Sequence, residues 1–212
     1  MIDKRITAIT AQKQNPNRVN IYLDGEYSFS LSRLIAAWLE PGKVLDQKQI
    51  DELVEKDSKE KTLQAALKLV DYRARTEKEV RDKLSKKGFE SANIEDVVSR
   101  LRENRMLADG EFAESWVENR NQFHPRSQRL MKYELRNKGI SEDQIEEALK
   151  NSAGDDTLAL KAANKVSNRF KELDWQEFQK KMMAYLLRKG FSYDVVIPTI
   201  KKVWRELQND EK

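Results

Sequence analysis

Apolar and polar residues alternate in the first part of the chain, with the two-residue period of a β-strand that has one buried face. The alternating segments are Ile6–Thr10, Val19–Leu23 and Tyr27–Leu31. Asp24-Gly25 stands between the last two segments and is a strong signal for a tight hairpin turn. We therefore expect a small three-stranded antiparallel sheet over residues 4–31.

Helical patterns replace the alternation after this sheet. Ser32 is expected to cap a short helix that runs to Leu39, and Asp46 is expected to start a second helical stretch. From about Thr62 onward, apolar residues recur at the three- and four-residue spacing of helices with one buried face. The sequence thus predicts a small β-rich part followed by a long helical part.

A short pattern, Leu-x-x-Lys-Gly followed by Phe or Ile, occurs three times in the helical part. Its glycines are Gly88, Gly139 and Gly190, and successive glycines are 51 residues apart. A fixed period of this size is typical of a chain built from repeated supersecondary units. The period favours an extended binding protein over an enzyme with a pocket.

The repeated pattern has a physical explanation at the end of a helix. Glycine adopts the left-handed conformation at the C′ position without the steric cost that a Cβ would carry. If Gly88 is at C′, then Leu84 and Phe89 are the two positions whose side chains touch in a Schellman ending. This interpretation locates the repeated units but does not show what they bind.

Signals for helix starts recur in every unit. Thr76 and Ser127 are equivalent N-caps, Ser141 and Gln144 form a capping box, and Asp174 opens a helix of the third unit. We predict a mainly α fold, with tandem three-helix repeats in an elongated, curved array behind a small N-terminal antiparallel β-sheet. The predicted segments are residues 1–56 for the sheet with a helical extension, 57–108 for the first repeat, 109–154 for the second and 155–212 for the third.

The composition fits an array of this kind. Charged residues make up 36% of the 212-residue chain, which is more than a globular protein usually carries and suits a large exposed surface. Four Trp, seven Phe and six Tyr still supply enough apolar volume for cores, so global disorder is not expected. The start of the chain lacks a signal-peptide pattern, and no apolar run approaches the roughly 20 residues that span a bilayer. We expect a cytoplasmic protein with no membrane partner.

Candidate catalytic and metal-binding residues are few. The chain has no cysteine, and its single histidine, His124, stands in a predicted turn before a helix. One histidine without thiolates cannot assemble a typical zinc site, and no phosphate-binding glycine loop is present. Carboxylates are numerous, but they have the spacing of ion pairs on helix surfaces. We therefore expect neither an enzyme nor a bound cofactor or metal.

The net charge of +4 conceals a segregation of charge between helices. The middle helix of every unit is predicted to be basic, and in a stacked array these helices would form a positive stripe. Such a stripe could follow a DNA backbone or meet an acidic protein surface, while a solvated, ion-paired helix face remains an alternative. The candidate contact residues are Arg73, Arg75, Arg81, Lys86, Lys87, Arg120, Arg126, Arg129, Lys132, Arg136, Lys138, Arg188 and Lys189.

The second unit has the least balanced charge. Arg129, Lys132 and Arg136 fall on one helix face. Together with Arg126, these residues have few acidic residues nearby with which to pair. Phe123 is the best candidate for an exposed aromatic ring on which a nucleic-acid base could stack.

Three tandem three-helix units with this pattern on the middle helix resemble RecX, the family of bacterial regulators of the RecA recombinase. The resemblance covers about residues 62–207. It is carried by Arg75–Leu84 in the first unit and by Tyr133–Ile140 in the second, which is the more specific of the two. The β-rich extension before the repeats is similar to that of longer family members.

The resemblance implies a non-enzymatic inhibitor that binds the RecA filament on single-stranded DNA and restrains strand exchange, ATP hydrolysis and the SOS response. RecA and single-stranded DNA are the implied partners. The family offers no catalytic residues, so the contact residues named above rest on charge alone. Two rivals remain open, namely a general nucleic-acid-binding repeat protein without a recombinase partner and a purely structural adaptor. Stacked repeats usually need no second chain, so we expect a monomer.

Overall fold

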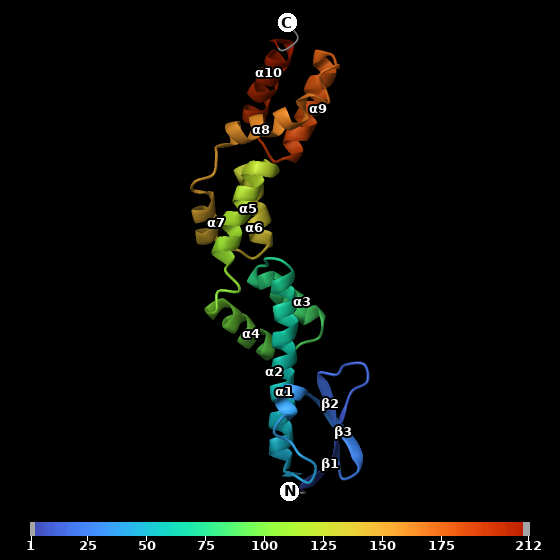
Figure 1. Cartoon of the computed structure of the whole chain (residues 1–212). Coiled ribbons are helices and arrows are strands. Elements are labelled where there is room, and N and C mark those ends of the chain that lie inside the picture. Colours follow the sequence, from blue (N-terminus) through green and yellow to red (C-terminus); the bar gives the residue numbers. More distant parts are fainter. Residues whose placement is uncertain (1–2, 210–212) are drawn as a thin grey trace. The chain divides into compact units, whose positions relative to one another are not determined.

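The computed structural model describes residues 3–209; residues 1–2 and 210–212, at the ends of the first and last predicted segments, lie outside this range. Strands occupy the N-terminal part of the chain, and the remainder is helical (Figure 1). The chain forms two compact units. One contains the chain up to Arg73 together with Val80–Met106, and the other contains Ala74–Glu79 with the chain from Leu107 onward.

The sheet of the first unit has four strands, whereas the sequence predicted three. They are β1 (Lys4–Ala11), β2 (Arg18–Leu23), β3 (Glu26–Ser32) and β4 (Val44–Leu45), in the order β3-β2-β1-β4 and antiparallel throughout. The prediction missed β4 because two residues are too few to show an alternating pattern. Asp24 and Gly25 have φ angles of 51° and 91°, so the predicted two-residue turn between β2 and β3 is confirmed.

One face of this sheet packs against the first two helices, α1 (Arg33–Ala36) and α2 (Gln47–Tyr72). Ile6, Ile21 and Leu31 on this face are fully buried, as the alternation of apolar residues in the strands requires. The sheet and the two helices therefore enclose a small apolar core of their own.

Helices α1 and α2 begin at the predicted caps. The side chain of Ser32 accepts a hydrogen bond from the backbone at the start of α1. Asp46 exchanges hydrogen bonds with Gln49 in a capping box at the start of α2. Helix α1 ends at Ala36 and is shorter than expected, since the predicted end was Leu39.

Helix α2 is one continuous helix of 26 residues, although the sequence suggested two helical stretches. Its sequence contains neither Gly nor Pro, so no residue in it interrupts the backbone hydrogen bonds. The boundary predicted between residues 56 and 57 lies inside this helix. The division of the chain into four segments stays a prediction.

A buried carboxylate joins α2 to the sheet. The side chain of Asp57 is 3% exposed and accepts hydrogen bonds from Nη1 and Nη2 of Arg18 on β2, at 3.2 and 2.9 Å. The backbone amide of Ser32 donates a further bond at 2.6 Å, and Nζ of Lys61 lies 2.9 Å away. Burial by itself raises the pKa of Asp57, but these donors outweigh it and hold the pKa below its usual value.

Helices α3 (Glu77–Lys86) and α4 (Ser91–Glu103) complete the first repeat, although the first turn of α3 belongs to the second unit. Helix α4 packs on α2, where Nδ2 of Asn93 donates a 2.9 Å hydrogen bond to Oγ of Ser58. The residues predicted to face inward are buried, namely Val80, Leu84, Ile94, Val98 and Leu101.

The second unit contains two further helix triplets. Their helices are α5 (Asp109–Phe123), α6 (Gln128–Asn137), α7 (Glu142–Leu149), α8 (Asp155–Ser167), α9 (Trp175–Arg188) and α10 (Tyr193–Asn209). The first helix of each triplet packs against the third, α5 on α7 and α8 on α10, just as α2 packs on α4. This packing confirms the prediction of three-helix repeats that follow a small N-terminal sheet in the sequence.

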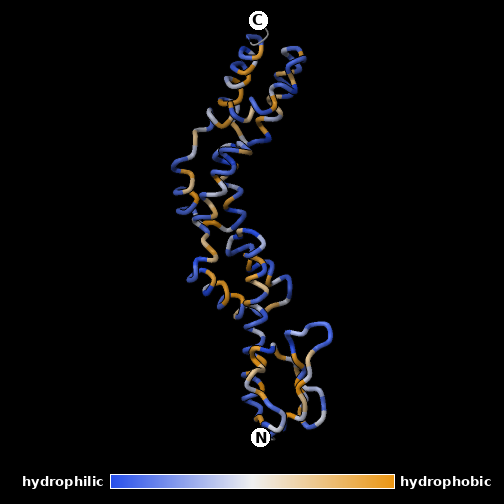
Figure 2. Tube along the Cα trace, viewed as in Figure 1, coloured by the Kyte–Doolittle hydropathy of each residue, from blue (hydrophilic) through white to orange (hydrophobic). Residues whose placement is uncertain are grey.

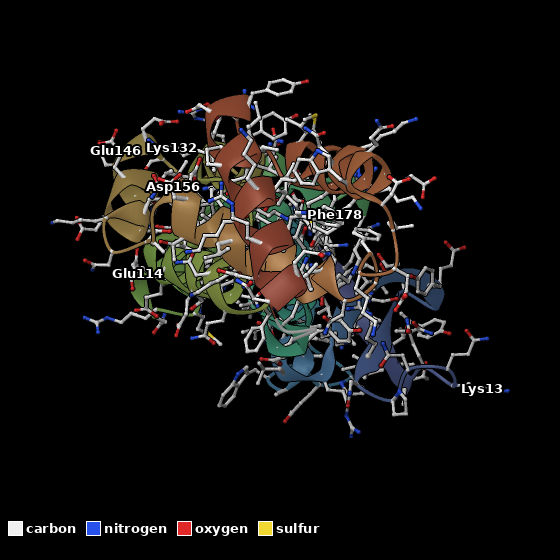
Figure 3. All side chains as sticks on the ribbon, turned by 90° about the horizontal axis from the view of Figure 1, so that it is seen from above. Lys13, Glu114, Lys132, Glu146, Asp156 and Phe178 are labelled. Carbon is white, nitrogen blue, oxygen red and sulfur yellow. The ribbon has the colours of Figure 1, made fainter. Side chains whose placement is uncertain are left out.

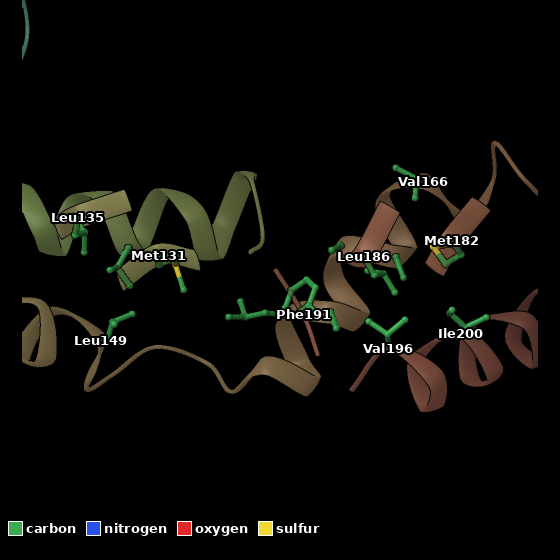
Figure 4. Close-up of a cluster of buried hydrophobic side chains, with 14 of the residues drawn as sticks. Met131, Leu135, Leu149, Val166, Met182, Leu186, Phe191, Val196 and Ile200 are labelled. Atoms are coloured by element: carbon green, nitrogen blue, oxygen red, sulfur yellow. The ribbon is translucent and has the colours of Figure 1, made fainter. Parts of the chain in front are cut away.

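The two triplets of the second unit share one apolar core. Figure 2 shows apolar positions recurring along α5–α10, and Figure 3 shows Phe178 among the helices while Glu146 projects outward. Phe191 is 1% exposed and lies between Met131 of the second repeat and Val196 of the third (Figure 4). Buried apolar contact therefore joins these neighbouring repeats.

The middle helices α3, α6 and α9 all end in the predicted Schellman motif. Gly88, Gly139 and Gly190 have φ angles of +81°, +85° and +88°, in the left-handed region. In the first motif the amide of Phe89 bonds the carbonyl of Leu84 at 3.3 Å, and the other two motifs repeat this pairing. The sequence interpretation of the three glycines as helix ends is confirmed.

Two of these glycines also meet the preceding repeat. A Cβ added at Gly139 would lie 2.7 Å from Cβ of Lys78, and one added at Gly190 would lie 2.6 Å from Oγ of Ser127. Around Gly88 nothing in the described part of the chain lies within 4 Å of such an atom. The end of α6 thus docks on the first turn of α3, and the end of α9 docks on the first turn of α6. We call these contacts the first junction and the second junction.

Both junctions are closed by bonds from the start of one middle helix to the end of the next. In the first junction Oγ1 of Thr76 donates to the carbonyl of Lys138 at 2.7 Å. In the second junction the amide of Ser127, the residue equivalent to Thr76, donates to the carbonyl of Lys189 at 3.0 Å. These carbonyls belong to helix ends, where the backbone otherwise lacks donors.

An aspartate at the start of the next repeat completes each junction. Oδ1 of Asp109 accepts a 2.9 Å bond from the amide of Glu77, and Oδ1 of Asp155 accepts a 2.8 Å bond from the amide of Gln128. Both acids lie at the first turn of a middle helix, where unpaired amides and the helix dipole favour negative charge. The repeats are therefore joined in the same way twice.

Asp57→Asn should lower the free energy of unfolding by about 3 kcal/mol, because Arg18 would keep its partly buried charge without a counter-charge. A carboxyl whose pKa is lowered by folding stabilises the protein fully above its unfolded pKa of about 3.9, and this stability is lost as the pH falls through the folded pKa. The variant should therefore lose less stability than the wild type on acidification. Urea unfolding followed by circular dichroism, from neutral to acidic pH, measures both effects.

The matched control is Asp51→Asn, at an exposed position of the same helix. This change should alter the free energy of unfolding by no more than about 0.5 kcal/mol. Equal stabilities of the two variants would mean that Asp57 does not hold the sheet on α2.

Substituting alanine for each of the three glycines should distinguish the role of the glycine in ending a helix from its role in the contact with the preceding repeat. Each substitution places a Cβ in the left-handed region, which costs about 1–2 kcal/mol. Gly139→Ala and Gly190→Ala should cost clearly more than Gly88→Ala, because their Cβ atoms would overlap Lys78 or Ser127. Urea unfolding of the three variants measures the difference, and equal losses would show that the glycines only end helices.

Candidate polyanion interface

The candidate cations of the first unit lie on its surface. Arg73, Lys86 and Lys87 are exposed, and Nε of Arg81 lies 2.9 Å from Oε1 of Glu95 in an ion pair. Lys87 also lines an open groove of about 630 Å³, which is lined by the further cations Arg18, Arg33, Lys61 and Lys68. Arg18 and Lys61 are paired with Asp57, and Glu60 also lines the groove. Arg33 of α1 and Lys68 of α2 are therefore the cations that this groove adds to the predicted middle helices.

Two candidates near the first junction are engaged inside the second unit. Arg75 is only 8% exposed. Nζ of Lys138 lies 2.7 Å from Oε1 of Glu79 and 4.5 Å from the centre of the Trp116 ring. Arg75 is thus largely buried, and the contacts of Lys138 tie the end of α6 to the first turn of α3. Neither side chain belongs to the exposed cationic surface.

Helix α6 exposes most of its predicted basic face. Arg129 and Arg136 are exposed, Lys132 is half-buried, and Tyr133 is 60% exposed beside them. Nη2 of Arg136 donates a 2.8 Å bond to Glu142 at the start of α7. Few acidic residues were expected near Arg136, and the partner that it has lies beyond the glycine turn on the next helix.

Glu134 on α6 forms ion pairs with two further candidate cations, Arg120 and Arg126. Its carboxylate accepts hydrogen bonds from Nε of Arg120 at 3.1 Å and from the indole of Trp116 at 2.9 Å, and it contacts Arg126. Cζ of Arg120 also lies 4.1 Å from the centre of the Trp116 ring, in a cation–π contact. Arg126 is thus paired with Glu134, one of the few acidic residues near it in the sequence.

A surplus of positive charge remains at the second junction. Arg120 and Arg126 share Glu134 there, and Nζ of Lys165 donates to the carbonyl of Phe123. The amide of Ser127, the neighbour of Arg126, donates to the carbonyl of Lys189. These four cations and Arg188, the neighbour of Lys189, form what we call the second-junction cluster. Burial, together with repulsion from the other four cations, lowers the pKa of Lys189. Within residues 3–209, Glu134 is the one carboxylate in ion-pair contact with any member of the cluster.

Two further features of this cluster favour an anionic ligand. Nε of Arg126 is buried and has no hydrogen-bond partner among the described residues, and a buried donor left unsatisfied costs about 1–3 kcal/mol. Phe123, the predicted stacking residue, is 59% exposed, and its carbonyl accepts a 2.8 Å bond from Nζ of Lys165. An exposed aromatic ring next to clustered cations is the arrangement that single-stranded nucleic acids favour.

Sequence reasoning missed two residues of this surface. Lys165 lies on α8, the first helix of its triplet, and only the contact between repeats brings it to the cluster, so the sequence held no signal for it. For Tyr133 the sequence did contain a signal that its side chain is exposed. Met131 and Leu135 were expected to face inward, and this places the position between them on the opposite side of the helix.

The described residues include no cluster of three or more His, Asp or Glu side chains that could hold a metal ion. In the same range, no helix combines the length and apolar character needed to cross a bilayer.

The fold defines a helical-repeat protein in which a small antiparallel sheet precedes three three-helix units along the chain. Family models match the chain in the corresponding order. They are the regulatory protein RecX N-terminal domain over residues 4–46 and the first, second and third three-helix domains of RecX over residues 63–101, 109–149 and 155–197. The chain belongs to the RecX family, as the resemblance in its sequence indicated.

Individual relatives match over nearly the whole chain. Regulatory protein RecX of Bacillus subtilis is 36% identical over 210 residues, which are 97% of this chain and 79% of the relative. The protein of the same name from Clostridium perfringens strain SM101 is 34% identical and covers 98% of both chains.

Solved structures of the family share the fold. A crystal structure of regulatory protein RecX superimposes with a TM-score of 0.67 at 30% identity, over 94% of this chain and 99% of the other. The RecX structure from Lactobacillus salivarius gives a TM-score of 0.58 at 29% identity, over 70% of this chain and 97% of the other.

Glu134→Gln should lower the free energy of unfolding by about 2 kcal/mol, because Arg120 and Arg126 would lose their shared counter-charge in a partly buried place. The loss should shrink as NaCl is raised, since salt screens the remaining repulsion. Thermal unfolding at several salt concentrations measures this dependence.

Glu142→Gln is the matched control, because Glu142 also accepts bonds from an arginine but lies half exposed with it. Its loss of stability should be smaller than that of Glu134→Gln. A loss of equal size and equal salt dependence in both variants would contradict a special role for Glu134.

Proposed function

We propose that this chain is a non-enzymatic regulator that binds the RecA filament on single-stranded DNA in the cytoplasm. Binding there would restrain strand exchange and ATP hydrolysis, and through them the SOS response. The observation that carries this proposal is the match of four RecX family models to successive segments between residues 4 and 197, together with relatives named regulatory protein RecX. The chain would act by contact and not by chemistry.

The outer face of α6 is the contact surface that we favour for the filament. Arg129, Lys132 and Arg136 place three cations there, and Tyr133 adds an exposed aromatic ring. The pair of Arg136 and Glu142 lies half exposed, so an anionic partner can replace Glu142 at little cost. Many such modest charge contacts would make the affinity depend on salt.

A general nucleic-acid-binding protein without a recombinase partner is the second candidate, and the second-junction cluster favours it. Titration of the chain against bare single-stranded DNA and against preformed RecA filament separates the two candidates. Tighter binding to the filament supports the first candidate, and equal affinity supports the second. A structural adaptor, the third possibility, would bind neither.

Charge reversal on α6 tests the proposed contact. The variant Arg129→Glu/Lys132→Glu/Arg136→Glu should lose most of its inhibition of RecA ATP hydrolysis on single-stranded DNA, because three attractive charges become repulsive. ATP hydrolysis measured against increasing concentrations of the variant gives the size of the effect, and circular dichroism checks that the helices persist.

The control variant carries the same change of charge on a third helix of a triplet. Lys201, Lys202 and Arg205 are exposed on α10, and their reversal to Glu should leave inhibition close to that of the wild type. Full inhibition by the α6 variant, or equal losses in both variants, would remove the outer face of α6 from the interface.

A further inference from the structure

The two junctions of the second unit are equivalent position by position but differ in charge. Residues of the first junction return 51 positions later in the second, so Lys138 corresponds to Lys189 and Glu79 corresponds to Leu130. In the first junction the carboxylate of Glu79 holds Nζ of Lys138 at 2.7 Å. In the second junction a leucine occupies the place of that acid.

This exchange leaves the second junction with unbalanced charge. Lys189 lies half-buried in a cluster with four other cations, and its Nζ lies 5.4 Å from the centre of the Tyr185 ring. Among the described residues no carboxylate lies within ion-pair distance of it. Glu134 is already shared between Arg120 and Arg126. Gathering like charges in a partly buried place is costly, and an external anion would remove that cost.

We propose that the second-junction cluster binds a phosphodiester group of a single-stranded nucleic acid, with the phosphate near the place that the carboxylate of Glu79 occupies in the first junction. The inference rests on the proposed function, in which the chain meets single-stranded DNA, and it names one site of that contact. The side chain of Arg126 is 32% exposed, so its guanidinium can meet a phosphate oxygen from outside. Arg126 and Lys189 together offer the planar donor set and the compact charge that phosphates attract.

Phe123 favours a nucleic acid over an acidic peptide as the occupant. Its ring is 59% exposed, and its carbonyl is bound by Lys165, a member of the cluster. A base of a single strand can stack on such a ring, whereas Asp and Glu side chains offer no ring for stacking and a duplex hides its base faces.

Leu130→Glu tests this site by restoring the acid of the first junction. The new carboxylate should pair with Lys189 as Glu79 pairs with Lys138, so the variant should bind a fluorescein-labelled oligo-dT on the order of tenfold more weakly than the wild type. The slope of log affinity against log salt concentration should decrease by about 0.7 for each phosphate group that the variant no longer binds. Fluorescence anisotropy with the full chain measures both quantities.

Leu130→Gln is the matched control, since it has nearly the same shape as the glutamate variant without its charge. Its affinity should stay close to that of the wild type. Lys189→Gln is a second test that adds no acid, and it should weaken binding as Leu130→Glu does even if the glutamate variant fails to fold.

Four results would overturn the site. The first is equal affinity of the wild type, Leu130→Glu and Lys189→Gln for oligo-dT, and the second is an equal loss of affinity in Leu130→Glu and Leu130→Gln. The third is no binding of oligo-dT by the wild type. The fourth is competition by polyglutamate or inorganic phosphate as strong as competition by unlabelled oligo-dT at equal charge. Inhibition of RecA ATP hydrolysis is measured separately. A wild-type chain that binds oligo-dT at this site without inhibiting RecA would refute the proposed function and leave the site standing.

Discussion

The second unit depends on the close approach of one helix end to the start of another. Each approach needs a left-handed residue without a Cβ, because the atoms of the preceding repeat lie within 2.7 Å of where that Cβ would be. Gly139 and Gly190 therefore do two things at once, since each ends a helix and admits its neighbour. The carbonyls at each helix end then bond the first turn of the preceding middle helix, and Asp109 or Asp155 satisfies a further amide there.

The same docking decides where positive charge gathers. A basic residue stands just before each glycine, so every junction brings a lysine against the preceding repeat. In the first junction Glu79 neutralises Lys138. In the second junction Leu130 leaves Lys189 among like charges. At the N-terminal sheet the charge is balanced instead, because the buried carboxylate of Asp57 accepts hydrogen bonds from Arg18 and from the amide of Ser32. Charge is thus balanced where the structure needs stability and unbalanced where a polyanion could bind.

Local chemistry made much of the fold predictable. The glycine pattern predicted the ends of α3, α6 and α9, and serine and aspartate caps predicted the starts of α1, α2, α6, α7 and α9. These features depend on neighbours within one turn of chain. The short strand β4 and the acidic partner of Arg136 were missed, because each depends on residues that belong to another element. The candidate cations could be named from the sequence, but their individual environments were not predictable.

The sequence by itself determined the repeats, their helix ends, the basic character of the middle helices and the resemblance to RecX, because each of these is a property of residue order over a few turns. Tertiary structure alone decided which cations face a carboxylate and which face one another. Ion pairing depends on distances of a few ångströms between side chains, and those distances are set by how the helices dock. For this reason Lys138 and Lys189, which occupy the same place in the repeat, have opposite electrostatic surroundings.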